Sequence, residues 1–97
     1  MLVVVATVPG RPDKRADILA ALTTCAAASR KDPGCLSYVF TSDVEDENSY
    51  ASIETWDDQA SLDAHMQQPH TQALLAALPP WVAGAPVITT YEVSEVH

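Results

Sequence analysis

Hydrophobic and polar residues alternate along three stretches of the chain, and a fourth stretch is apolar throughout. Residues 2–8, LVVVATV, form a β-branched apolar run that ends before a Pro-Gly pair, as buried strands do. Residues 35–42 and 49–56 alternate with a period of two and are joined by a short acidic loop, which predicts a β-hairpin. Residues 87–96 alternate in the same way. The pattern therefore predicts four strands.

The hydrophobic period changes to that of a helix in residues 11–31, 57–67 and 69–78, with a loop over 79–86. The first helix carries one stripe of small and apolar side chains: Ile18, Leu22, Cys25, Ala26 and Ser29. A proline suits the first turn of the first and third of these helices, and two aspartates open the second. The sequence DPG, residues 32–34, ends the first helix.

The order β-α-β-β-α-β predicts an α+β domain spanning residues 1–97, with a ferredoxin-like antiparallel sheet covered by helices on one face. In each alternating strand we expect the following side chains to share a face: Leu36, Tyr38 and Phe40; Tyr50, Ser52, Glu54 and Trp56; Val87, Thr89, Tyr91 and Val93. The second face of the sheet also carries apolar residues. Pairing two such sheets would cover it, so we expect a homodimer.

The charge distribution argues against two classes of partner. The net charge is −8, and all five Lys and Arg residues lie between positions 11 and 31. Nucleic acids and anionic membranes need clustered cations, so we expect neither as a partner. The apolar start lacks the basic region of a signal peptide, and no stretch has the length of a membrane span. With two cysteines in no metal-binding spacing, expected to be free thiols, we predict a cytoplasmic protein.

Three groups of residues resemble one protein family. They are Pro33-Gly34-Cys35 with Tyr38, then Glu54-x-Trp56, then His65 followed by Pro69-His70. In this order and spacing, over residues 2–96, the chain resembles the antibiotic biosynthesis monooxygenase family of dimeric α+β barrels. The resemblance implies a cofactor-independent monooxygenase that oxidises a quinol- or hydroxyquinone-like aromatic with O₂. The alternative is a non-catalytic dimer of the same fold that binds a small ligand or serves a stress-related role.

Two departures from the family pattern bear on the activity. The haem-degrading branch places an Asn on the first strand, and residues 2–8 contain none. Some polyketide oxygenases place an Arg in the pocket, and this chain has no Arg beyond position 30. Haem degradation is therefore disfavoured, no cofactor is expected, and an anionic intermediate would lack a stabilising cation.

Oxygenation without a cofactor needs a base that removes a proton from an enol or phenol inside a dry pocket. His70, at the start of helix 69–78 and on its apolar stripe, is the first candidate; it could equally cap or pack the helix junction. His65 faces the sheet from helix 57–67. We expect a hydrogen bond between His65 and Glu54, which would orient the imidazole in catalysis or form a purely structural buried pair.

Aromatic residues are the candidates for a substrate-binding wall. They are Trp56, Tyr38, Phe40, Tyr50 and Trp81. Trp56 could instead be simple core, and Trp81 could be a pocket lid or a dimer contact. Two histidines and a glutamate could also form a facial metal triad, but we expect no metal because Glu54 is assigned to His65.

Overall fold

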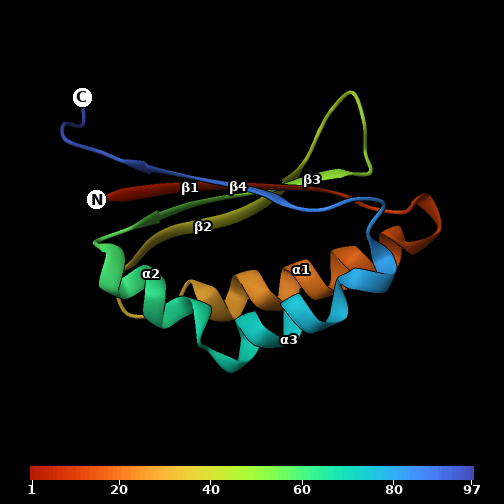
Figure 1. Ribbon diagram of the computed structural model, residues 1–97, viewed down its shortest axis with the longest axis horizontal. Helices are drawn as coiled ribbons and strands as arrows, with labels where there is room; N and C mark the ends of the chain where they lie inside the picture. The colour runs from red at the N-terminus through yellow and green to blue at the C-terminus, as the bar shows by residue number, and fades with distance from the viewer.

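The computed structural model describes residues 1–97 and contains four strands and three α-helices (Figure 1). In chain order the elements are β1 (Leu2–Pro9), the 3₁₀ turn η1 (Pro12–Lys14), α1 (Arg15–Ser29), β2 (Cys35–Ser42), β3 (Ser49–Trp56), α2 (Gln59–Met66), α3 (Pro69–Ala77), the 3₁₀ turn η2 (Pro79–Trp81) and β4 (Val87–Glu92). The predicted α+β order is confirmed.

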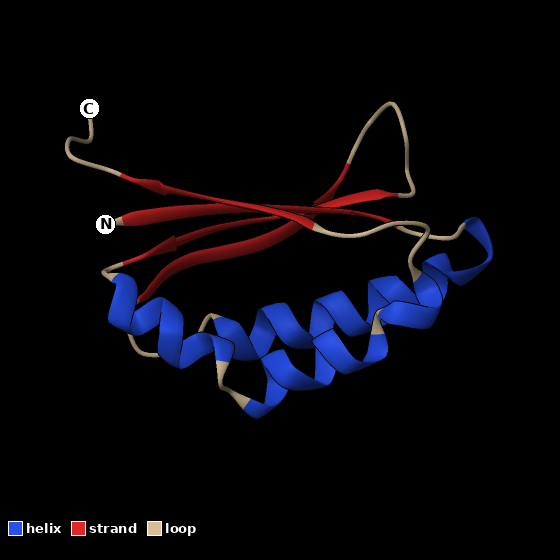
Figure 2. Cartoon of the chain, in the orientation of Figure 1, coloured by secondary structure: helices blue, strands red, loops and turns tan.

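The strands form one antiparallel sheet in the order β2-β3-β1-β4. All three helices lie on the same face of this sheet, and the opposite face has nothing packed on it (Figure 2). This is the ferredoxin-like arrangement expected from the sequence. No helix is both long and apolar enough to cross a membrane.

The core lies between the sheet and the helices. The stripe predicted for α1 supplies all five buried residues of that helix: Ile18, Leu22, Cys25, Ala26 and Ser29. The face predicted for β3 is likewise buried along its whole length, from Tyr50 through Ser52 and Glu54 to Trp56. One face of β3 therefore places two large aromatic side chains and a carboxyl group together in the core.

Three local predictions needed correction. Residues 11–14 do not continue α1, since a 3₁₀ turn precedes the helix at Arg15. Leu36 does not share a face with Tyr38, because a β-bulge shifts the pairing between Cys35 and Ser37 and leaves Leu36 53% exposed. The last strand ends at Glu92, so Val93 lies beyond it.

The uncovered face of the sheet is rich in apolar side chains. The register places Val5 opposite Ile53 on one side and Thr89 on the other, so these residues share that face. Val39 pairs with Ile53 across β2 and β3, and both are more than 40% exposed. Tyr91 of β4 is 55% exposed. A contiguous apolar face of this kind is typical of an interaction surface.

Candidate active site

A cavity of about 310 Å³ lies on the covered side of the sheet. Side chains from all four strands and all three helices line it, and most of them are hydrophobic. The polar groups on its wall include His65 of α2, Thr71 of α3 and Glu54 of β3. A mostly apolar cavity with a few polar groups is the usual form of a small-molecule site.

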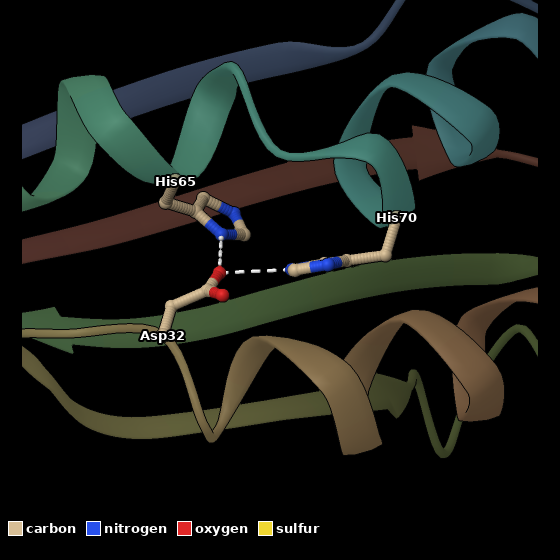
Figure 3. A group of neighbouring side chains, drawn as sticks. All are labelled: Asp32, His65 and His70. Carbon is tan, nitrogen blue, oxygen red and sulfur yellow. Dashed lines mark hydrogen bonds and ion pairs between the residues drawn. The ribbon is translucent and has the colours of Figure 1, made fainter.

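Asp32, His65 and His70 form a hydrogen-bonded cluster between α1, α2 and α3 (Figure 3). The Oδ2 atom of Asp32 lies 2.8 Å from Nδ1 of His65 and 2.8 Å from Nε2 of His70. Asp32 and His65 are 8% and 2% exposed, and His70 is 21% exposed. The carboxylate thus holds both imidazoles by one oxygen atom, in a largely dry environment.

The backbone after α1 fixes the position of Asp32. Its amide donates to the Ser29 carbonyl, and its own carbonyl accepts from the Cys35 amide. Gly34 then takes a φ of +80°, which favours glycine, and its carbonyl accepts from the Asp57 amide just before α2. This turn is therefore tied to the start of the helix that carries His65.

The two short helices place the imidazoles. The Asp58 side chain caps α2 by accepting from the Ser61 amide at 2.8 Å, and His65 follows in the last turn of that helix. Pro69 opens α3, which puts His70 in its first turn. Because α2 and α3 are separated by two residues only, both histidines face the same carboxylate.

The cluster determines which nitrogen of each histidine carries hydrogen. An ionised carboxylate only accepts hydrogen bonds, so His65 donates from Nδ1 and His70 from Nε2. In the neutral imidazole of His65, Nε2 then keeps its lone pair. His65 also lines the cavity, and Nε2 is the ring nitrogen that Asp32 does not hold. The same ring packs against Trp56 and Tyr38, at centroid distances of 4.6 and 5.4 Å, which restricts its rotation.

The predicted hydrogen bond between Glu54 and His65 is wrong. The carboxyl group of Glu54 instead accepts from Ser52 Oγ at 2.7 Å and from Trp56 Nε1 at 3.0 Å. These donors stand two residues away on the same strand, so the period of the strand already supplies partners for Glu54. Glu54 is 5% exposed and no Lys or Arg pairs with it. The cavity wall therefore carries a carboxyl group held by neutral donors.

The structure separates the remaining predicted residues into two sets. Tyr38, Phe40 and Tyr50 line the cavity together with His65 and Glu54. Three others do not line it. Trp56 is fully buried and packs against the His65 ring. Trp81 packs against the core residues around Ile18 and Leu22. His70 contacts the same oxygen of Asp32 as His65 does, but it does not line the cavity.

Burial keeps two further cavity groups in their neutral forms. It is the main cause that raises the pKa of the Cys25 thiol and the pKa of the Tyr38 phenol, and the nearby Glu54 charge raises both further. Neither group is therefore suited to act as a base at neutral pH. Among the cavity-lining groups, the imidazole of His65 has the chemistry that a proton acceptor needs.

Sequence reasoning missed Asp32. The sequence pattern gives Asp32 itself no role beyond ending a helix, and nothing in its spacing connects it to histidines 33 and 38 residues later. One signal was present, because Asp32 directly precedes Pro33-Gly34-Cys35, the first group of the family resemblance. A carboxylate next to Pro33-Gly34-Cys35 was therefore a candidate hydrogen-bond partner for His65 and His70.

Comparison with known proteins supports the resemblance. Residues 1–77 match the family described as antibiotic biosynthesis monooxygenase. Among curated proteins, the uncharacterized protein sll1783 of Synechocystis is 33% identical over 96 residues, which are 99% of this chain and 65% of that protein. The candidate monooxygenase YcnE of Bacillus subtilis is 29% identical over 76 residues, 78% of this chain and 80% of YcnE. The chain thus spans about two-thirds to four-fifths of these relatives.

Solved structures share the whole fold. A candidate antibiotic biosynthesis monooxygenase from Caulobacter crescentus superposes with a TM-score of 0.91 at 33% identity, covering 97% of this chain and 90% of that one. Another from Deinococcus radiodurans gives a TM-score of 0.94 at 26% identity, covering 100% of this chain and 96% of that one. The sequence match covers well over half of the chain and the fold agrees along its length, so this protein belongs to the antibiotic biosynthesis monooxygenase family.

Proposed function

We propose that this protein is a cofactor-independent monooxygenase that oxidises a quinol- or hydroxyquinone-like aromatic with O₂, and that His65, oriented by Asp32, is its base. The observation that carries the proposal is the Asp32–His65 hydrogen bond at the wall of the apolar cavity. Asp32 holds the Nδ1 hydrogen and leaves the lone pair of Nε2 for the substrate hydroxyl. A carboxylate in this position also stabilises the imidazolium that forms when the proton is taken.

The chemistry balances without an external reductant. His65 Nε2 takes the proton of a bound hydroxyl group, and the resulting anion reduces O₂ more readily than the neutral quinol does. One oxygen atom enters the ring and the other leaves as water, so a quinol and O₂ give a hydroxyquinone and H₂O. The apolar wall keeps bulk water away from the reactive intermediates. Phe40, Tyr38 and Tyr50 provide flat surfaces against which an aromatic ring can pack.

The proposed base is His65, whereas the sequence alone favours His70. His70 donates to Asp32 and does not line the cavity, so its role here is to hold the carboxylate against His65. Glu54 is proposed to accept a hydrogen bond from a second substrate hydroxyl, in addition to Ser52 and Trp56. Trp56 supports His65 from behind, and no substrate contact is proposed for Trp81.

One observation favours the alternative function, a non-catalytic dimer that binds a small ligand. The cavity contains the Glu54 carboxyl group and no Lys or Arg, so a ligand that is already anionic when it binds has no permanent cationic partner there. A neutral apolar ligand would meet no such difficulty.

The uncovered sheet face supports a homodimer, which we propose as the working form. Val5, Val39, Ile53 and Tyr91 lie on it, and a second copy of the same face would remove their apolar surface from water. The cytoplasmic location stays a prediction.

Oxygen uptake tests the two functions against each other. Protein freed of metal and flavin is mixed with a panel of quinols, and O₂ consumption is compared with the quinone formed. A monooxygenase gives one hydroxyquinone per O₂ and releases no H₂O₂. His65→Gln slows the reaction by at least about 100-fold, and His97→Gln, at the exposed terminus, does not. Tight binding of quinols with no uptake by any variant would reject the enzyme and favour the ligand-binding dimer.

A further inference from the structure

We propose that Asp32, His65 and His70 form a binding site for one divalent transition-metal ion. Their ligand atoms all lie within 4.8 Å of one another, and they come from the turn after α1, from α2 and from α3. Two imidazoles and one carboxylate are a ligand set typical of Zn²⁺, Fe²⁺, Co²⁺ and related ions. The metal triad considered from the sequence consisted of the two histidines and Glu54; in the structure the carboxylate beside the histidines is Asp32.

Binding one ion requires the three ligand atoms to rearrange, chiefly by bringing together the two histidine nitrogens, which lie within 4.8 Å of each other. With metal–ligand bonds of about 2.0 Å and tetrahedral angles, ligand atoms stand about 3.3 Å apart. Asp32 Oδ2 is already 2.8 Å from each histidine nitrogen, so the ion would replace the two hydrogens that these pairs now share. His70 opens α3 after a two-residue connection from α2 and is 21% exposed, which gives both freedom to move and a path of entry.

The surroundings favour a cation. No Lys or Arg is paired with Asp32, and the nearby Arg30 uses its Nε to donate to the Tyr38 carbonyl. With two neutral imidazoles and one carboxylate the site carries one negative charge, in a chain whose net charge is −8. Thr71 Oγ1, 3.3 Å from His65 Nδ1, lies close enough to hydrogen bond to a water that completes the coordination.

Metal binding has a consequence for the proposed base, and this step rests on the proposed function. A metal ion on Nδ1 of His65 leaves the ring hydrogen on Nε2, which turns this nitrogen, the proposed base, from an acceptor into a donor. The metal-bound protein can then no longer take a proton from a substrate. The ion is therefore an inhibitor of the oxidation, and the metal-free protein is the active form.

The test is a titration of the full metal-free chain with Co²⁺, followed by its visible absorption, with Zn²⁺ as competitor. We expect one Co²⁺ per chain with a band typical of nitrogen and oxygen ligands. His70→Gln should lower the Co²⁺ affinity by at least about 100-fold. Losing a residue that only hydrogen-bonds to a metal ligand lowers the affinity by about 100-fold at most, so a larger loss identifies His70 as a ligand itself. The matched control, His97→Gln, removes the third histidine, which lies 3.9 Å from Glu95, and leaves the affinity unchanged.

The readout does not depend on His70→Gln being folded, because imidazole NMR signals of the unmutated protein report the same event. Zn²⁺ should shift the signals of His65 and His70 and not those of His97. Absence of stoichiometric Co²⁺ binding, or binding that only His97→Gln removes, would overturn the site. A Co²⁺ spectrum in a protein that oxidises no quinol would reject the proposed function and keep the site. Oxidation that continues at full rate with the ion bound would overturn the inhibition.

Discussion

Replacing Asp32 is the most informative single change, because one oxygen atom of this side chain holds both histidines. In Asp32→Asn the side chain keeps its shape, but it offers one carbonyl oxygen and one amino group where the carboxylate offered two acceptors. If the amino group meets His65, Nδ1 becomes the acceptor and the ring hydrogen moves to Nε2. The base is then lost although the fold is kept.

The size of the effect follows from the two 2.8 Å contacts. A hydrogen bond to a charged group contributes about 1.5–3 kcal/mol and one between neutral groups about 0.5–1.5 kcal/mol. Each contact therefore loses about 1 kcal/mol, and the free energy of unfolding should fall by about 2 kcal/mol. In a domain of this size that corresponds to a Tm lower by about 10 °C. Oxidation should fall by about 100-fold or more, the usual contribution of a general base.

Three measurements on the same protein sample separate the roles of Asp32. Urea unfolding followed by tryptophan fluorescence gives the stability, at one fixed protein concentration because the stability of a dimer depends on concentration. Oxygen uptake gives the activity, and ¹⁵N NMR of the imidazoles shows which nitrogen of His65 carries hydrogen. Asp57→Asn, on an exposed side chain, is the matched control. Full activity in Asp32→Asn would refute the reasoning whichever tautomer His65 adopts, because the amide also removes the charge that stabilises the imidazolium.

Three further predictions concern other parts of the molecule. Gly34→Ala should lower the free energy of unfolding by about 1–3 kcal/mol, because φ is +80° and a Cβ would stand 2.1 Å from the Ser61 hydroxyl; an unchanged urea midpoint would contradict this. Burial raises the pKa of Cys25, so less of this thiol is ionised at pH 8 in the folded than in the unfolded protein. Iodoacetamide at pH 8 should therefore modify Cys25 far more slowly in the folded protein, and equal rates would contradict its burial. Ile53→Asp, on the uncovered sheet face, should halve the particle mass measured by light scattering, because it places a charge in the proposed dimer interface. A monomer mass for the unmutated protein would contradict the proposed dimer.

The fold was predictable because its signals are local. A period of two placed Tyr50 and Trp56 on the buried face of β3, and a period of 3.6 placed Ile18 and Leu22 on the buried stripe of α1. The bulge that exposes Leu36 was not predictable in this way. An inserted residue changes the pairing between two strands without altering the composition of either one.

The site was predictable only in part, for a related reason. His65 and Glu54 were placed correctly on surfaces that face each other, since each belongs to a regular element. Their partners were not, because a hydrogen bond joins whichever donor and acceptor lie nearest in space. The sequence neighbours Ser52 and Trp56 satisfied Glu54, and Asp32, 33 residues away from His65, took the place assigned to Glu54.

An anaerobic titration tests the central claim most directly, because it isolates proton transfer from the reaction with O₂. A hydroxyquinone whose anion absorbs at a different wavelength from its neutral form is added to metal-free protein at a pH where the free compound stays neutral. The account predicts that the unmutated protein produces the spectrum of the bound anion, that His65→Gln binds the compound in its neutral form, and that His97→Gln behaves as the unmutated protein does. A bound anion of equal yield in His65→Gln would contradict the assignment of His65 as the base.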